Sequence, residues 1–410
     1  MLTRAGPQSM VPSDRSVNRL TATFITCFPQ VVPRLWKDPS EHNPRMDPAM
    51  LRDQLLAEAR ARGFSSAGIA SVLPFRRVRA RALRAIDEGR MAGMSWYSPE
   101  RVEASTDLTR RHPWARSLLA LAWPYPPATR PGPAPAPWQA APGRPRGRIA
   151  AYTCLAGAGG GAVDYHDHLA AACDGLVAWL RERSGELRAH RFIDHGWAID
   201  RAVAERAGIG FAGKNACLIT REAGSYVLLA EVLLSLPLPP TPRSRRGCGH
   251  CRACLPACPT GAITEPGVID SRRCISYLTI EHRGPIPVEL RPLIGTWAFG
   301  CDLCQEACPV NARLAPAELE AGAPTTAAGP VPHPDLVECL ELDDEEFRRR
   351  FRRTAVWRTG RAGLARNAAI ALGNAGDRGA LGPLRRAADD DPDPVVREAA
   401  SWAVARLEPV

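Results

Sequence analysis

Eight cysteines between Cys248 and Cys308 constrain the fold of this chain more than any other feature. The first four follow the C-x2-C-x2-C-x3-C-P pattern of two-cluster ferredoxins, in which the fourth cysteine of a run ligates the other cluster. The second run holds three cysteines, because Ala307 stands where another would fall, and Cys274 completes the number. Exchange of the last cysteine of each run then predicts two 4Fe–4S clusters. The ligands would be Cys248, Cys251, Cys254 and Cys308 for one cluster, and Cys258, Cys274, Cys301 and Cys304 for the other.

Disulfides and zinc are the competing explanations of these cysteines. Disulfides need an oxidising compartment, and the chain shows no secretory signal. Structural zinc sites use two C-x2-C pairs, not a run of three cysteines followed by C-P. The remaining cysteines are scattered, and each is expected to be a small buried apolar side chain. They are Cys27, Cys154, Cys173, Cys217 and Cys339.

The formal charge of +10 over 410 residues favours a polyanionic partner. Arginine carries nearly all of the positive charge, since Lys37 and Lys214 are the only lysines in the sequence. Retention of Lys214 suggests that a compact ammonium is needed there. No apolar stretch is long enough to span a bilayer. We therefore expect a monomeric protein of the reducing cytoplasm, without a membrane partner.

Helix and strand patterns predict an α+β protein of several domains. Residues 48–63 have helical spacing, strand-like segments follow at 68–72 and 117–123, and helix resumes at 164–186. This alternation is typical of an α/β domain. Near the C-terminus, two similar helical phrases suggest HEAT-like repeats. The expected parts are residues 1–45, a disordered or untranslated extension; 46–239, the α/β domain; 240–314, a ferredoxin-like domain; 315–335, a linker; and 336–410, the helical repeats.

Asp194 is the first candidate for chemistry outside the cysteine runs. It follows a strand-like R-F-I segment, and a carboxylate shielded at a strand end can act as a general acid. Capping of the next helix explains Asp194 equally well, and both interpretations stay open. The nearby D-Y-H-D-H segment, which begins at Asp164, is better explained as a polar helix N-terminus than as a metal site.

Eight arginines between Arg348 and Arg366 form a basic run with aromatic neighbours. Such a run is either a solvated helix face or a surface for RNA phosphates and stacked bases. The glycine-rich G-I-G-F-A-G-K-N segment at 208–215 is not a phosphate-binding loop, because its glycines are misplaced and Asn215 replaces the Ser or Thr.

Several of these segments resemble the epoxyqueuosine reductase family, the cobalamin-dependent enzymes of tRNA queuosine synthesis. The resemblance runs from about Met46 to the C-terminus. The matching phrases are D-Y-H at 164–166, D-R-A-V-A-E-R-A-G-I-G-F-A-G-K-N at 200–215, E-A-G-S-Y at 222–226, the cysteine run to Ile263, R-R-C-I-S-Y-L-T at 272–279, G-C-D-L-C-Q-E-A-C-P at 300–309 and R-N-A-A-I-A-L-G-N at 366–374. The chain departs from the family pattern in extra glycines before Asp164 and in a long Pro-rich insertion at 124–146.

The resemblance implies a base-off cobalamin between residues 46–239 and the ferredoxin-like domain, with Asp194 as proton donor. The reaction would be two-electron deoxygenation of the epoxide on epoxyqueuosine in tRNA with a GUN anticodon, with electrons from a flavodoxin or ferredoxin. The tRNA contacts implied are His282, Arg358 and Arg361. The cofactor contacts implied are Arg101, Asp194, Gly196, Trp197, Ala198, Ile199, Asp200, Arg201, Lys214, Asn215, Leu218, Leu229 and Ser276.

Two other functions fit part of this pattern. A reductive dehalogenase also pairs base-off cobalamin with two clusters, but a twin-arginine leader and no RNA-binding tail would be expected of it. A corrinoid-reducing electron carrier would need neither Asp194 nor the arginine-rich tail.

Overall fold

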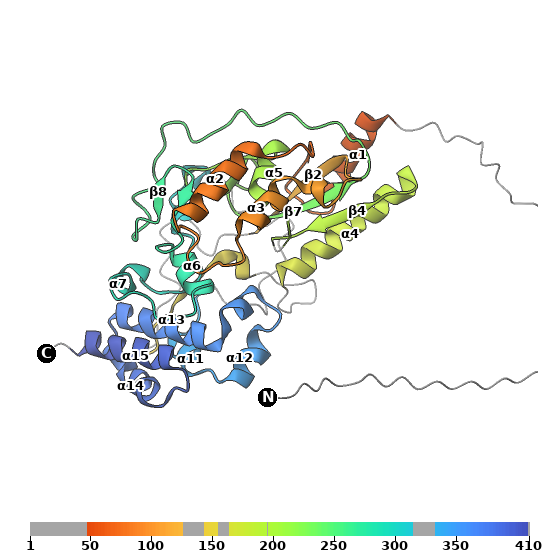
Figure 1. The fold of residues 1–410 in the computed structure, drawn as a ribbon. Coiled ribbons are helices and arrows are strands. Elements are labelled where there is room, and N and C mark those ends of the chain that lie inside the picture. The colour runs from red at the N-terminus through yellow and green to blue at the C-terminus, as the bar shows by residue number, and fades with distance from the viewer. Residues whose placement is uncertain (1–46, 126–142, 155–163, 195, 315–332, 409–410) are drawn as a thin grey trace, which may run out of the picture. The chain divides into compact units, whose positions relative to one another are not determined.

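An antiparallel sheet of four strands in the order β1-β2-β7-β4 organises the first half of the chain (Figure 1). The computed structural model describes residues 47–125, 143–154, 164–194, 196–314 and 333–408. In register, Glu231 of β7 lies opposite Ala120 of β2 and Phe192 of β4. The strands are β1 (Ser66–Ala70), β2 (Ser117–Pro124), β4 (Ala189–Phe192) and β7 (Val227–Leu234).

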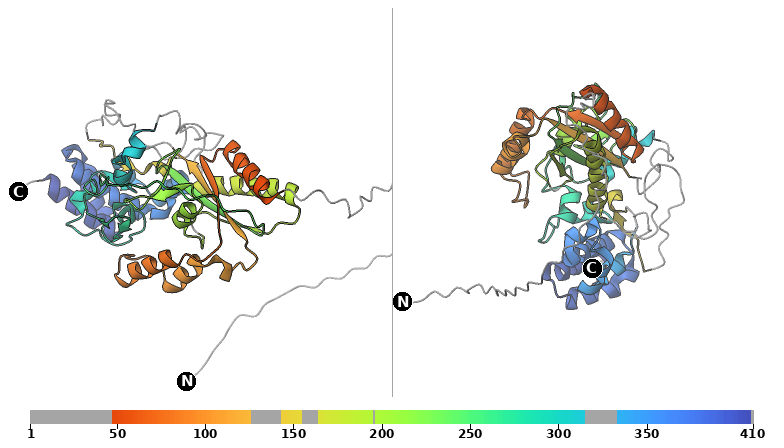
Figure 2. Two further views of the ribbon diagram at one scale, coloured as in Figure 1. Left: turned by 90° about the horizontal axis from the view of Figure 1, so that it is seen from above. Right: turned by 90° about the vertical axis from the view of Figure 1, so that its right-hand side faces the viewer.

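Helices cover both faces of this sheet. Leu228 and Ala230 of β7 share a core with α1 (Pro48–Ala61) and α4 (Tyr165–Ser184). Leu233 faces the other way, toward α5 (Asp200–Arg206). The expected starts of the long helices are confirmed, since α1 and α4 begin after aspartates that accept their first amides. The remaining helices of this half are α2 (Arg76–Asp87) and α3 (Pro99–Thr106), which pack on each other (Figure 2).

The sheet differs from the α/β arrangement that the sequence suggested. All three strand pairs are antiparallel, so this half of the chain is α+β. The helices between β1 and β2 return the chain antiparallel instead of building a parallel crossover. Alternating strands and helices do not by themselves fix strand direction, which is why the sequence pattern was misleading here.

Short elements make up the cysteine-rich segment, as expected for a chain that wraps around small groups. Its helix α6 (Ile275–Ile280) begins directly after Cys274, and α9 (Pro309–Ala312) directly after Cys308. The strand β10 (Trp297–Phe299) pairs in parallel with β3 (Arg148–Ile149). The segment also contains β8 (Ile263–Glu265), β9 (Val268–Ile269), α7 (Arg291–Ile294) and α8 (Leu303–Glu306). Before it in the chain lie the paired short strands β5 (Gly210–Ala212) and β6 (Leu218–Thr220).

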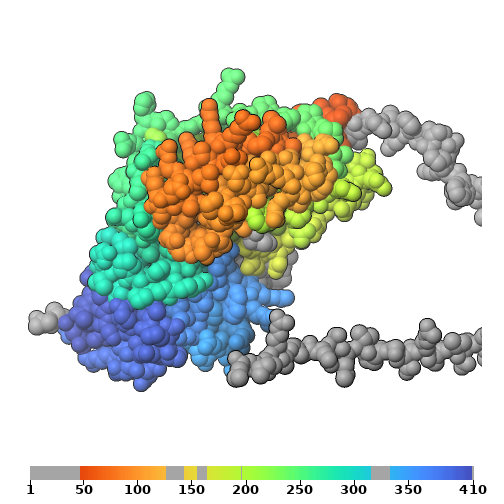
Figure 3. Space-filling model, viewed as in Figure 1, coloured from red at the N-terminus to blue at the C-terminus, as the bar shows by residue number. Residues whose placement is uncertain are grey.

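The C-terminal helices share one hydrophobic core with residues 275–299. In Figure 3 these helices, in blue, directly adjoin the teal cysteine-rich segment. The two similar phrases of the sequence form α13 and α15, which pack against each other. Asn367 of α13 donates to the carbonyls of Thr279 and Ala298, each over 2.8 Å. Removal of this segment would therefore expose the core of the cysteine-rich segment. The helices are α11 (Leu336–Glu341), α12 (Asp344–Phe351), α13 (Gly360–Ala375), α14 (Leu381–Asp390) and α15 (Pro394–Leu407).

Three expectations fall largely outside the described residues: the extension over 1–45, the Pro-rich insertion, and most of the linker at 315–335. No helix in the described parts of the chain is long and apolar enough to cross a membrane.

Candidate active site and cluster-binding region

Asp194 lies just beyond the edge strand β4, with its backbone at φ +54°. A non-glycine residue in this left-handed region is uncommon, and such strain is typical of functional positions. The hydroxyl of Tyr165 donates to the Asp194 carboxylate over 2.7 Å. Helix α5 begins after Ile199 without a side-chain cap. Asp194 does not cap that helix, so the capping interpretation is wrong.

Arg358 brings the C-terminal part of the chain to this carboxylate. Its guanidinium lies 3.5 Å from Asp194 and 3.5 Å from Glu281. Burial alone would lower the pKa of Arg358, but Tyr165 and Asp194 raise it above its ordinary value. Burial, and next the charge of Asp194, raise the pKa of Tyr165. Both groups therefore stay in their hydrogen-bond-donating forms, and both donate to Asp194. Neither Tyr165 nor this ion pair was evident in the sequence, because the three residues are far apart along the chain.

Arg361 does not fit the role of an RNA contact. Its side chain is buried and makes a bidentate ion pair with Asp391, with both distances 2.9 Å. Arg366 is also buried and donates to backbone carbonyls of residues 278, 282 and 284. The basic run thus divides into buried structural arginines and exposed ones, and forms no single face. His282 is half-buried, with its ring nitrogen 3.0 Å from the Pro285 carbonyl.

The loop between β4 and α5 forms an aromatic and basic surface. Arg101 donates to the Gly196 carbonyl over 2.6 Å, and its guanidinium lies 5.0 Å from the ring centre of Trp197. The guanidinium of Arg111 also stacks on that ring, 3.8 Å from its centre. Residues 196–200 are all half-buried. Arg201 donates to the Ala216 carbonyl and so joins this loop to the one between β5 and β6.

The central strand β7 is incompletely covered beside this loop. Val227 and Leu229 are only half-buried, although Leu228 and Ala230 on the opposite face belong to the core. An apolar face of a central strand that is left open is unusual in a packed domain. Val227 and Leu229 pack against the same apolar cluster as Trp197 and leave part of their own surface uncovered. Leu218 belongs to that cluster and is itself buried.

Lys214 and Asn215 contact the cysteine runs. The ammonium of Lys214 donates to the carbonyls of Gly249 and Cys251, over 2.7 and 2.9 Å. Asn215 donates to the Cys304 carbonyl over 3.3 Å. Lys214 therefore secures the first cysteine run, and its ammonium does not point to a separate anionic group. A compact ammonium that bonds two carbonyls explains why arginine has not replaced it.

Cys217 and Ser276 are both half-buried. Cys217 is close to the cysteine runs in space, and Ser276 is close to Cys274 in sequence. The thiol of Cys217 interacts with that of Cys304, which lowers the pKa of Cys217. The position of Cys217 in the sequence, far from the two runs, gives no indication of this contact. Ser276 belongs to the first turn of α6, two residues after Cys274.

Glu231 is a buried carboxyl in the middle of the sheet, on the face that carries α5. Its oxygens have no hydrogen-bond partner of ordinary geometry among the described residues. Burial raises its pKa well above the ordinary value, and the carboxyl of Asp200 raises it further. Burial likewise raises the pKa of Asp200 to about 6, and the charge of Asp194 adds to the effect. Asp200, which the resemblance placed at the cofactor, therefore forms an acidic pair with Glu231, and the charge of Asp194 acts on both carboxyls.

The raised pKa of Glu231 predicts a pH dependence of stability. A carboxyl whose pKa is higher in the folded state stabilises the fold below its unfolded pKa, and this contribution is lost as pH rises toward the folded pKa. Glu231→Gln removes that loss. Between pH 6 and pH 8.5, its Tm should therefore rise relative to wild type by about 2–4 °C, the usual effect of about 1 kcal/mol. Parallel Tm curves would contradict this prediction, and the exposed Glu182→Gln serves as control.

The seven cysteines of the two runs, together with Cys274, fall into two electrostatic groups. The Cys254 thiol interacts with Cys248, Cys251 and Cys308. Cys301 interacts with Cys258 and Cys274, and Cys304 with Cys301 and Cys274. No group of three or more His, Cys, Asp or Glu in the described residues is arranged to hold a single metal ion. The two groups of four cysteines suit cubane clusters, because a cubane holds its four cysteine sulfurs apart from one another.

Comparison with known proteins supports iron–sulfur clusters in this segment. Residues 247–311 match the family model of the 4Fe-4S double cluster binding domain. The cysteine-rich segment thus defines an iron–sulfur protein with two clusters.

Relatives of the whole chain identify a more particular family. Epoxyqueuosine reductase of Bacillus subtilis is 34% identical over 367 residues, which cover 88% of this chain and 89% of the relative. That of Escherichia coli is 39% identical over 244 residues, 59% of this chain and 63% of the relative. The chain belongs to the epoxyqueuosine reductase family, whose members are oxidoreductases.

Solved structures of the family have the same fold. An epoxyqueuosine reductase in complex with an epoxyqueuosine-modified stem loop of tRNA-Tyr superposes with a TM-score of 0.77, at 33% identity over 88% of this chain and 91% of that chain. A structure of the Bacillus subtilis enzyme, with its catalytic aspartate loop swung out of the active site, also gives 0.77, at 32% identity over 88% and 92%.

Proposed function

We propose that this protein reduces epoxyqueuosine to queuosine in tRNA, using cobalamin and two 4Fe–4S clusters. The observation that carries the proposal is the site at Asp194. Asp194 has a strained backbone, and its carboxylate accepts hydrogen bonds from Tyr165 and from Arg358 of the C-terminal part of the chain. A relative bound to a modified tRNA stem loop supports tRNA as the substrate. The substrate would be a tRNA with a GUN anticodon, and the enzyme a cytoplasmic monomer.

The half-buried apolar surface of β7 suits the face of a corrin ring. A corrin needs an apolar face to lie on and hydrogen-bonding groups around its amide rim. Leu229 and Trp197 offer half-buried apolar surface, while Arg101 and Asn215 lie at the edges of the adjoining loops. The residues expected to hold cobalamin therefore suit it, apart from Lys214 and Asp200, whose contacts lie elsewhere.

The two cysteine groups fit two clusters in the exchanged arrangement. Cys258, Cys274, Cys301 and Cys304 would hold an inner cluster, because Asn215 joins the proposed corrin site to Cys304. Cys248, Cys251, Cys254 and Cys308 would hold an outer one. When bound, the clusters would deliver electrons and the reduced cobalamin would supply a strong nucleophile for the epoxide carbon.

Asp194 supplies the proton that opening of the epoxide requires. Removal of the oxygen consumes two electrons and two protons, and it gives a carbon–carbon double bond and water. Asp194 donates a proton to the epoxide oxygen as a C–O bond breaks, which makes the oxygen a better leaving group. Tyr165 holds the carboxyl in position through its hydrogen bond. The φ angle of +54° directs Asp194 away from the course of β4.

Arg358 links recognition of RNA to this acid. Among the arginines of the basic run, it is the one whose guanidinium contacts Asp194. A tRNA phosphate that binds Arg358 would draw the cation away from the Asp194 carboxylate, so that the carboxylate is free to take up a proton. We assign Arg358 and His282 to the tRNA face and leave Arg361 out, since it is buried against Asp391. The helices of residues 336–410 would act as a HEAT-like support for that face, beside the proposed domains 46–239 and 240–314.

The direct test is turnover of a modified substrate. Protein purified without oxygen and loaded with cobalamin should convert an epoxyqueuosine-containing stem loop to queuosine when a chemical reductant is added. Mass spectrometry of the digested RNA would show the loss of one oxygen. An unchanged nucleoside, with both clusters and cobalamin bound, would refute the proposal.

A further inference from the structure

The outer cysteine group reaches the surface at one point. Cys251 is exposed, whereas Cys274 and the other cysteines of the two runs are buried or half-buried. Its neighbours His250 and Arg252 are exposed as well. Electron transfer weakens steeply with distance, so an external donor gains most by docking where a cluster ligand is exposed. The inner group has no exposed cysteine.

The segment of the chain that carries Cys251 has positively charged residues and no acidic one. From Val232 to Thr264 the sequence contains no Asp or Glu, and its charged residues are four arginines. We call these the basic loop arginines: Arg243, Arg245, Arg246 and Arg252. All four are exposed.

The basic loop arginines have no carboxylate partner, whereas some other surface arginines of this protein are paired. Elsewhere, arginines such as Arg79, Arg349 and Arg385 form ion pairs with nearby glutamates. None of the basic loop arginines makes an ion pair with a carboxylate of the described residues. Arg243 instead lies near another arginine, Arg206. Burial lowers the pKa of Arg206 to about 10, and the charge of Arg243 adds to this effect. Unpaired like charges repel one another, so they cost stability unless a partner neutralises them.

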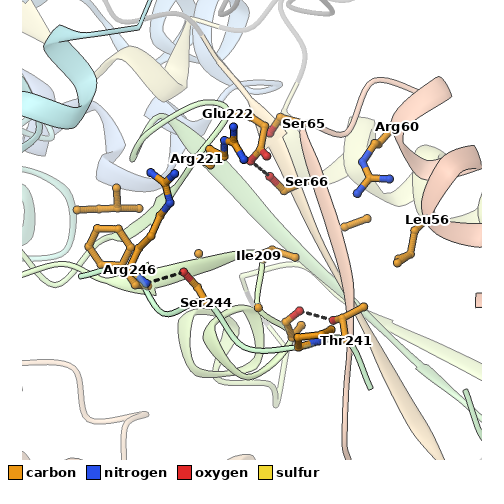
Figure 4. A pocket seen from close by; sticks show the side chains of 17 residues that line it. Leu56, Arg60, Ser65, Ser66, Ile209, Arg221, Glu222, Thr241, Ser244 and Arg246 are labelled. Atoms are coloured by element: carbon orange, nitrogen blue, oxygen red, sulfur yellow. Dashed lines mark hydrogen bonds between the residues drawn. The ribbon is translucent and has the colours of Figure 1, made fainter. Parts of the chain in front are cut away.

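A pocket next to the loop continues this surface. It has a volume of about 300 Å³, and Arg246 lines it together with Arg221 and Arg60. Figure 4 shows Arg221 and Arg246 on one side of the pocket and Arg60 on the other. The one carboxylate there, Glu222, accepts a hydrogen bond from Ser66 over 2.7 Å. Among the charged groups that line the pocket, the three guanidinium groups therefore outnumber the one carboxylate.

We propose that the basic loop arginines form the docking surface for an acidic electron-carrier protein, which reduces the outer cluster beside Cys251. This inference rests on the proposed function, because that function needs an external source of electrons. Complementary charge speeds such encounters and orients them, and small interfaces are usual for transient redox partners. RNA would also be attracted by four arginines. An acidic protein fits better, because the same segment carries the exposed cysteine Cys251, and the proposed RNA contact, Arg358, lies at Asp194.

The test reverses charge at the loop and measures reduction of the clusters. In the double variant Arg245→Glu with Arg252→Glu, the second-order rate at which reduced flavodoxin reduces the clusters should fall about tenfold or more at low salt. The wild-type rate should itself fall as ionic strength rises, while the rate of the variant should depend little on salt. Binding of oxidised flavodoxin, measured by calorimetry, should weaken in parallel. The matched control is Arg181→Glu with Arg188→Glu, which makes the same charge change at exposed positions around the end of α4.

Other outcomes separate this inference from the proposed function. With dithionite, which needs no docking, the variant should reduce its clusters and convert the modified stem loop as wild type does. Equal flavodoxin kinetics in wild type and variant would overturn the docking surface and leave the proposed function intact. A loss of affinity for full-length modified tRNA, with unchanged flavodoxin kinetics, would assign the surface to RNA instead. Iron content and the visible absorbance of the clusters check that both variants are folded.

Discussion

Asp194→Asn should lower the rate of epoxide reduction by about 10² to 10⁴-fold, the usual contribution of a positioned general acid. Asparagine keeps the size of the side chain and can still accept the hydrogen bond from Tyr165. It cannot donate a carboxylic proton to the epoxide oxygen. Single-turnover conversion of the modified stem loop by the prereduced, cobalamin-loaded enzyme measures this step without interference from electron delivery.

Binding measurements distinguish loss of the acid from loss of the fold. In the wild type, Asp194 shares Arg358 with Glu281. The neutral amide releases this cation, so the affinity of the variant for the stem loop should be unchanged or higher, and cobalamin content should stay the same. Asp174→Asn is the matched control, because Asp174 is an exposed aspartate that pairs with Arg191 over 2.7 Å. Retention of full activity in Asp194→Asn with cofactor bound would exclude Asp194 as the acid.

The parts of the structure that depend on local chemistry were predictable from the sequence. Asp47 and Asp164 cap α1 and α4, and Gly63 ends the first helix region at φ +101°. Each of these features needs only a few neighbouring residues, because capping and left-handed glycines act within one turn. Cysteine spacing has the same local character, and the family match over 247–311 agrees with it.

The parts that depend on distant contacts were not predictable. Strand direction in the sheet follows from how β1, β2 and β7 meet, and no local pattern states it. Arg358 and Arg361 are three residues apart in one basic run, yet one reaches Asp194 and the other is buried against Asp391. Glu231 sits in a strand of apolar residues, where its pairing with Asp200 could not be seen. These features arise only when separate elements pack together.

Loss of one cluster at a time should follow the exchanged ligand sets and not the order of cysteines in the chain. Cys308→Ser and Cys254→Ser should both lose the outer cluster, because the Cys254 thiol groups with Cys308 of the second run. Cys258→Ser and Cys301→Ser should both lose the inner cluster, since Cys301 groups with Cys258. Each variant should retain roughly half of the iron, about four atoms per chain, and lose turnover with flavodoxin as donor.

Electron paramagnetic resonance of the reduced variants provides the sharpest form of this test. The cluster that remains should give one spectrum in Cys308→Ser and Cys254→Ser, and a different spectrum in Cys258→Ser and Cys301→Ser. Without the exchange, Cys258→Ser would instead resemble Cys254→Ser, because both residues belong to the first run. Cys173→Ser and Cys339→Ser, which change buried cysteines outside the runs, should keep the full iron content and both signals. In the exchanged sets, the exposed ligand Cys251 belongs to the outer cluster, whereas Asn215 donates to the Cys304 carbonyl of the inner one.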